Sequence, residues 1–242
     1  MLNKILIAIL VAFPCFAQRL PDKQTIGLTP KNSVVLRGIV NDSSTTNIQL
    51  ALAELDAERG SQNFPIYLVI DSPGGSIDAG ESFIQFAKTI PNLQTISIFA
   101  ASMASAIVEG LPGRRSVTQN GILMFHRAKG GFEGQFNDGE IEQELALFKS
   151  FVQSMEERNA ARLKLTIDAY KAKVKDEFWA FGDNTVTTGM ADEVINIKCS
   201  KELIDTRTRE ANQSIFGTVT TSYSGCPLFR APLPEEATSE NQ

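Results

Sequence analysis

The chain has 242 residues, of which 43% are hydrophobic, 21% charged and 8% aromatic, a balance typical of a globular protein and not of a disordered or fibrous one. Its formal net charge is −5, from 23 basic and 28 acidic residues, which argues against nucleic-acid binding through a basic surface. The sequence holds one histidine, His126. A multi-histidine metal site is therefore excluded within one chain, and we expect neither a metal nor another cofactor.

The first seventeen residues have the pattern of a secretory signal peptide. Lys4 precedes an unbroken apolar run, Ile5 to Phe13, and Cys15 and Ala17 are small residues at the −3 and −1 positions of a cut after Ala17. The run is far shorter than the roughly 20 residues that span a bilayer. We therefore expect an exported protein, periplasmic or secreted, with no stable membrane anchor after cleavage. The alternatives are an N-terminal membrane anchor, a buried core strand or a lipid anchor on Cys15.

Cleavage would leave two cysteines, Cys199 and Cys226. An even pair in an exported protein predicts one disulfide, which would attach the C-terminal segment to the residues before it. The alternative is a pair of free thiols.

Predicted strands and helices alternate along most of the chain. The clearest strand is the apolar run over 66–70, which is typical of a strand buried on both faces of a parallel sheet. Repeated strand–helix units predict an α/β fold with layers packed on a parallel sheet. In chain order, the elements are a polar lead-in at 18–32, strands at 34–36 and 66–70 separated by a helix at 43–59, a helix at 79–89, a strand at 94–99, a helix-compatible small-residue stretch at 100–108, a strand at 122–125, and helices at 140–164 and 167–174.

This alternation fades near residue 200. Residues 206–242 are rich in Thr, Ser, Glu, Gly and Pro, which predicts a peripheral segment with a disordered tail. We divide the chain into a signal peptide at 1–17, a lead-in at 18–32, a main α/β domain at 33–198 and a C-terminal appendage at 199–242 that carries the disulfide.

Three sequence features follow predicted strands, where α/β folds place their active sites. The two glycines of Ser72–Gly75 allow backbone N–H groups to face a cavity and hold an oxyanion, or simply form a tight turn. Ser102 lies between a strand and a helix start, as a nucleophile or as a helix cap, and the amide of Met103 would also point at the oxyanion. His126 is the only possible histidine base for a serine.

A catalytic histidine also needs a carboxylate that orients its ring. Asp176, Asp183 and Asp192 all lie downstream of His126 in suitable positions.

Together these motifs resemble the Clp protease proteolytic subunit family over about Val34 to Val194. Ser102 matches the family's ASM motif, His126 its M-x-H motif and Asp176 its D-x-F motif, in the family's order and at similar spacing. The resemblance implies the layered fold of the Clp protease and crotonase superfamily. It also implies a serine peptidase with a Ser102–His126–Asp176 triad, and oxyanion donors at Gly75 and Met103.

The glycine-rich stretch from Gly130 to Gln135 and the helix from Glu140 resemble the family's handle strand and long handle helix. In the family this region stacks two rings face to face, so the resemblance implies a homo-oligomer, with rings as its expected form. The alternative is that the region caps a monomer or a smaller oligomer.

Export changes the expected partners of such a peptidase. The family's cytoplasmic members work with an ATP-driven unfoldase, and an exported protein has no ATP supply. We therefore expect a stand-alone enzyme whose substrates are peptides or unfolded proteins.

Three other functions compete with this one. A Ser–Lys protease similar to the signal-peptide peptidases would use Lys149 as its base. A catalytically inactive, ring-forming scaffold would explain why Ala104 replaces a family glycine and Arg127 a family glutamine. An acyl-CoA enzyme similar to the crotonases would share the fold, but a signal peptide argues against CoA chemistry.

Overall fold

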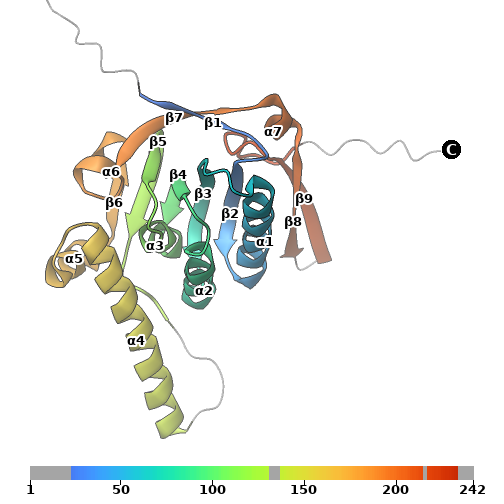
Figure 1. Cartoon of the computed structure of the whole chain (residues 1–242). Coiled ribbons are helices and arrows are strands. Elements are labelled where there is room, and N and C mark those ends of the chain that lie inside the picture. Colours follow the sequence, from blue (N-terminus) through green and yellow to red (C-terminus); the bar gives the residue numbers. More distant parts are fainter. Residues whose placement is uncertain (1–22, 131–136, 215–216, 234–242) are drawn as a thin grey trace, which may run out of the picture.

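One mostly parallel sheet organises the molecule (Figure 1). The computed structural model describes residues 23–130, 137–214 and 217–233. Strands run in the order β1-β7-β5-β4-β3-β2, and β6 pairs antiparallel with the second half of β5. The sheet strands are β1 (Thr25–Leu28), β2 (Ser33–Val40), β3 (Ile66–Gly75), β4 (Leu93–Ala101), β5 (Arg115–Phe125), β6 (Phe178–Phe181) and β7 (Glu193–Cys199).

Helices follow the central strands, as an α/β fold requires. The three helices α1 to α3 lie together on one face of the sheet, whereas α4 projects away from the body (Figure 1). The helices are α1 (Asp42–Arg59), α2 (Ile77–Ala87), α3 (Met103–Gly110), α4 (Asp138–Arg162), α5 (Ile167–Lys173), the 3-10 turn η1 (Val174–Asp176), α6 (Asp183–Thr187) and α7 (Lys201–Asp205). A separate hairpin is formed by β8 (Arg207–Ser214) and β9 (Gly217–Ser224).

Strand β3 shows why the 66–70 run is uniformly apolar. Leu68 and Ile70 are fully buried in the larger core, between the sheet and the helices. Val69 is fully buried in a second core on the opposite face, together with Leu28 of β1 and Cys226. The prediction of a strand covered on both faces is thus confirmed.

Side-chain caps fix the starts of the two longest helices. Asn41 accepts a hydrogen bond from the backbone N–H of Ser44, and the Ser44 hydroxyl accepts one from the N–H of Asn41. Asn137 and Glu140 form the same reciprocal pair at the start of α4. Such capping boxes satisfy N–H groups that the first helical turn leaves unpaired.

Some predicted boundaries were wrong. The lead-in at 18–32 contains β1, whose polar surroundings hid it but whose Ile26 and Leu28 are buried against β7. The strand predicted at 34–36 continues to Val40, because Gly38 has a positive φ of 74° and absorbs an irregularity in the pairing with β3.

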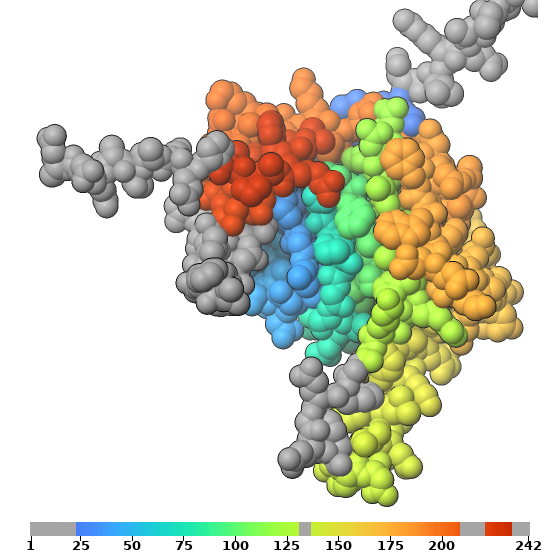
Figure 2. Space-filling view, turned by 180° about the vertical axis from the view of Figure 1, so that it is seen from behind, coloured from blue at the N-terminus to red at the C-terminus, as the bar shows by residue number. Residues whose placement is uncertain are grey.

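The C-terminal segment is attached as predicted by a disulfide between Cys199 and Cys226, with a Cα–Cα distance of 5.8 Å. Seen from behind, its red portion lies beside the blue and cyan strands (Figure 2). The β8–β9 hairpin within it was not predicted. The proposed signal peptide at 1–17 lies outside the described residues, as does most of the handle strand proposed at Gly130 to Gln135. Among the helices that the structure describes, none combines the length and apolar character needed to cross a membrane.

Candidate active site

Ser102 and His126 meet at the carboxyl ends of two neighbouring strands. The Ser102 Oγ lies 2.7 Å from the Nε2 of His126, within hydrogen-bond distance. Ser102 comes directly after β4 and His126 directly after β5, and the backbone N–H of Ser102 donates to the Met124 carbonyl of β5 at 2.9 Å. This backbone bond fixes the separation of the two side chains.

The backbone of Ser102 is held in an unusual conformation, with φ 57° and ψ −124°. Such a positive φ is strained for a serine and is typical of a sharp strand-to-helix turn that exposes a nucleophile. Ser102 precedes α3, but its side chain makes no capping hydrogen bond to that helix. The geometry thus disfavours a helix-cap role and leaves the hydroxyl free to face His126.

Gly74 and Gly75 bring the β3 backbone against the nucleophile. A Cβ added to Gly74 would lie 2.6 Å from the Ala101 carbonyl oxygen and 2.8 Å from the Met103 nitrogen, while one on Gly75 would lie 2.2 Å from the Val40 carbonyl oxygen. Only glycine fits at either position. Met103 is the first residue of α3, so its N–H has no partner within the helix. Gly75 and Met103 therefore border the space beside the Ser102 hydroxyl, where an oxyanion would form.

A cavity of about 220 Å³ opens next to these groups. Its walls are largely apolar. Besides Ser102 and His126, the polar side chains that line it are the exposed Lys129 and two buried ones, Asn159 of α4 and Tyr170 of α5. The sequence analysis missed Asn159 and Tyr170, because they lie within predicted helices and no motif marks them. The lining residues are Gly75, Ile77, Ser102, Met103, Ala106, Phe125, His126, Ala128, Lys129, Met155, Asn159 and Tyr170.

Asp176 lies near His126 in the backbone, but its carboxylate does not contact the ring. Phe125 pairs with Phe178 across β5 and β6, which places Asp176 at the His126 end of β5. The Asp176 side chain is exposed, and no hydrogen bond between the described residues joins it to His126.

The other two candidate acids have different partners. Asp183 forms an ion pair with Lys23, with 2.8 Å between Oδ1 and Nζ. Asp192 accepts hydrogen bonds from the backbone N–H and the guanidinium of Arg115, at 2.9 and 2.7 Å. Within the described residues, Asp176 is the candidate whose carboxylate is not engaged by another side chain.

The remaining predicted positions are not among the residues that line the cavity. Lys149 is exposed on α4 and does not line the cavity, so the structure offers no contact through which it would act as the base for Ser102. Arg127 is also exposed, and Ala104 is fully buried in the main core. The described residues contain no cluster of three or more His, Cys, Asp or Glu side chains that could hold a metal ion.

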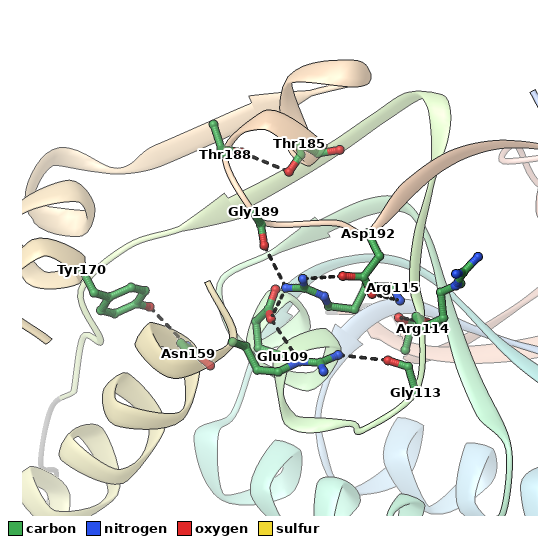
Figure 3. A network of polar contacts seen from close by, with 12 residues as sticks. Glu109, Gly113, Arg114, Arg115, Asn159, Tyr170, Thr185, Thr188, Gly189 and Asp192 are labelled. Carbon is green, nitrogen blue, oxygen red and sulfur yellow. Dashed lines mark hydrogen bonds and ion pairs between the residues drawn. The ribbon is translucent and has the colours of Figure 1, made fainter. Parts of the chain in front are cut away.

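A buried charged network lies at the far end of α3 from Ser102 (Figure 3). The Glu109 carboxylate is 2.7 Å from Nη1 of Arg115 and 3.8 Å from Nε of Arg162, so the network joins α3 to β5 and α4. Burial raises the pKa of Glu109 to about 7, against the lowering effect of the two guanidinium groups. The network fixes the helix that carries the nucleophile at its start.

Comparison with known families agrees with this geometry. A family model described as Clp protease matches residues 22–198, which cover every residue of the site and all of the main sheet except Cys199, the last residue of β7. The match ends just before Cys199, so the β8–β9 hairpin and both cysteines of the disulfide lie beyond it. A match over this much of the chain establishes membership. The chain belongs to the Clp protease family, and its family therefore implies a serine peptidase.

Proposed function

We propose that this protein is a serine endopeptidase in which Ser102 attacks the scissile carbonyl and His126 accepts the serine proton. The observation that carries the proposal is the 2.7 Å contact between Ser102 Oγ and His126 Nε2 at the edge of a cavity. A neutral imidazole at this distance removes the proton as the C–O bond forms and later returns it to the leaving amine. The acyl-serine is then hydrolysed by water.

The proposal assigns oxyanion stabilisation to the backbone amides of Gly75 and Met103. Each preorganised donor of this kind commonly contributes about 3 kcal/mol to transition-state stabilisation. Asp176 is assigned the role of orienting His126. Its carboxylate is exposed and makes no ion pair or hydrogen bond with the described residues, and the pairing of Phe125 with Phe178 places it at the His126 end of β5. In this proposal the hydrogen bond from His126 to Asp176 forms when substrate binds, since catalytic hydrogen bonds often tighten only in the substrate complex.

We further propose that the enzyme is exported, acts without an ATP-driven unfoldase and assembles into homo-oligomers. Peptides and unfolded proteins are its substrates, because no unfolding partner would supply folded ones. The long helix α4 supports assembly: it exposes four large apolar residues, which are Ile141, Leu145, Leu147 and Phe151.

The direct test is labelling of the protein by a fluorophosphonate, which reacts with an activated serine. We expect wild type to be labelled, and Ser102→Ala and His126→Ala to lose the label. Lys149→Ala should keep it, and serves as the control on an exposed helix position. Circular dichroism would verify that each variant is folded.

Other outcomes would redirect the assignment. Loss of labelling in Lys149→Ala with retention in His126→Ala would place the protein in the Ser–Lys class. A folded wild-type protein that takes no label would contradict peptidase activity and favour the inactive scaffold.

A further inference from the structure

The cavity beside Ser102 is lined by a polar pair, Asn159 and Tyr170, that the catalytic machinery does not use. Asn159 is 1% exposed, and its Nδ2 donates a hydrogen bond to the Tyr170 hydroxyl at 3.2 Å. The Asn159 Oδ1 is buried and has no hydrogen-bond partner within the part of the chain that the structure describes. A buried amide oxygen without a partner costs free energy, so its presence at a binding cavity points to a group that arrives with the ligand.

Tyr170 supplies the complementary half of the pair. It is 2% exposed, and its ring packs edge-on against Phe125, the residue before His126, with 6.1 Å between ring centroids. Its hydroxyl oxygen accepts from Asn159, and the hydroxyl proton has no acceptor among the hydrogen bonds of the described residues. A phenol in this setting stays protonated near neutral pH, because burial raises the pKa of Tyr170 to about 12.

The pair therefore presents one free acceptor, the Asn159 Oδ1, and one free donor, the Tyr170 O–H. Rotating the Asn159 amide by 180° exchanges the two roles and still leaves one donor and one acceptor. A primary carboxamide has the matching groups, since its carbonyl accepts one hydrogen bond and its NH₂ donates another. A carboxylate can pair with the exposed Lys129 of the cavity wall but has no donor for the Asn159 Oδ1, and an ammonium has no acceptor for the Tyr170 hydroxyl.

The rest of the cavity sets where this carboxamide must be. Met103, Ala106 and Met155 give it apolar walls, which suit a methylene stem. Because Ser102 and His126 line the same cavity, the side chain that fills it belongs to the residue whose carbonyl Ser102 attacks. Its volume of about 220 Å³ accommodates a long side chain.

We propose that this cavity selects substrates with a carboxamide side chain, glutamine foremost, at the residue preceding the scissile bond, and that Asn159 and Tyr170 are the specificity-determining residues. This inference rests on the proposed serine peptidase function. It adds a polar requirement that an apolar cavity of the same size would not impose.

The test compares fluorogenic peptides of one sequence that differ only in this residue: glutamine, asparagine, methionine or glutamate. Methionine matches glutamine in length without its hydrogen bonds, and glutamate replaces the NH₂ by a second acceptor. We expect kcat/KM for glutamine to exceed that for methionine and glutamate by at least about tenfold, because buried polar groups left unpaired discriminate strongly. Faster cleavage after asparagine than after glutamine would support the same site with a shorter reach.

Variants separate recognition from structure. Asn159→Leu should lower kcat/KM for the glutamine peptide about tenfold. Its kcat/KM for the methionine peptide should stay within about threefold of the wild-type value. Tyr170→Phe should also reduce the ratio of kcat/KM between the glutamine and methionine peptides. This variant removes the hydroxyl and keeps the aromatic ring. Gln153→Leu is the matched control, since Gln153 is an exposed amide on the same helix, and it should change neither value.

The failures of the two proposals are distinguishable. An enzyme that is labelled at Ser102 but cleaves the methionine peptide as fast as the glutamine peptide retains the peptidase function and overturns the polar requirement. If wild type cleaves none of the peptides, the inference is decided by calorimetric binding to the Ser102→Ala protein. Equal affinity for the glutamine and methionine peptides there would overturn it as well.

Discussion

The Arg230 guanidinium donates two hydrogen bonds to the carboxylate of Asp71, a residue 159 positions earlier in the chain. The distances are 2.9 Å from Nε to Oδ2 and 2.6 Å from Nη2 to Oδ1. Asp71 is buried on β3 and directly precedes the Ser72–Gly75 segment. These bonds attach the C-terminal segment, which lies beyond the family match, to β3, the strand whose end lies against Ser102.

Arg230→Ala should lower both stability and activity, because it leaves a buried carboxylate without its partner. Charge-assisted hydrogen bonds of this kind contribute on the order of 2 kcal/mol, and urea unfolding would measure the loss. Asp71→Asn combined with Arg230→Ala should recover part of it, since no unpaired charge remains. Equal stability of wild type and Arg230→Ala would show that solvent already satisfies Asp71.

The disulfide supports the same connection. Cys199 and Cys226 close a loop with a sequence separation of 27, for which chain-entropy arguments give about 3 to 4 kcal/mol of stabilisation. In the double variant Cys199→Ser, Cys226→Ser, the free energy of unfolding measured with urea should be lower by about this amount.

Because Arg230 lies only four positions beyond Cys226, we expect the loss from Arg230→Ala to be smaller in the background without the disulfide. A double-mutant cycle measures this coupling. Strict additivity would mean that Arg230 is held in place independently of the disulfide.

Asp176→Asn should reduce kcat for peptide cleavage about a hundredfold or more, because an asparagine cannot stabilise the imidazolium that forms on His126. The melting temperature should stay within experimental error, since the side chain is exposed. Asp183→Asn is the matched control, an exposed aspartate in the following helix, and its kcat should be unchanged. Near-normal turnover of Asp176→Asn would exclude it as the orienting acid.

The sequence predicted strands β2 to β5 at least in part, because apolar runs mark them, whereas β6 and β7 were not predicted. Ser102 and His126 were found by the same logic, since each follows such a run directly. Two further features, strand β1 and the polar pair in the cavity, were also not predicted. Strand β1 is short and surrounded by polar residues, so only its pairing with β7 reveals it.

The polar pair in the cavity escaped for a different reason. Asn159 and Tyr170 lie on α4 and α5, and nothing local distinguishes an asparagine that faces a cavity from one on a solvated helix face. Only the packing of α4 against α3 and of α5 against α4 brings the two side chains together in the cavity beside Ser102. Specificity of this type depends on tertiary contacts that no single segment encodes.

Assembly through α4 predicts a particle well above the 26.4 kDa of one chain in light scattering or mass photometry. Ile141 and Leu145 lie one turn apart on the same side of the helix and are 46% and 38% exposed. Replacing both by glutamate should reduce the particle mass, because a charged face cannot be buried against another subunit. Gln143→Glu adds charge to an exposed position of the same helix as a control, and should leave the mass unchanged.

A clean monomer for the wild type would contradict the proposed homo-oligomer. An unchanged particle in the glutamate double variant would instead place the interface elsewhere on the molecule.

Glu109 should make stability depend on pH in the neutral range. Burial raises its pKa in the folded protein from an ordinary value of 4.5 to about 7, so the folded state binds the proton more tightly than the unfolded state. This contribution is fully present below pH 4.5 and is lost as the pH rises to about 7. The free energy of unfolding should fall over that window, by at most about 1.4 kcal/mol per pH unit for one proton.

Glu109→Gln isolates this effect, because an amide keeps the size of the side chain and does not titrate. Urea unfolding at several pH values between 4.5 and 8 should show a slope for wild type that the variant lacks. Asp192 does not interfere: burial alone would raise its pKa, but hydrogen bonds from Arg115 lower it below 3.8, so its contribution is lost only at more acidic pH. Identical slopes in the two proteins would mean that Arg115 and Arg162 keep Glu109 ionised throughout, and that the network at the far end of α3 is a permanent set of ion pairs.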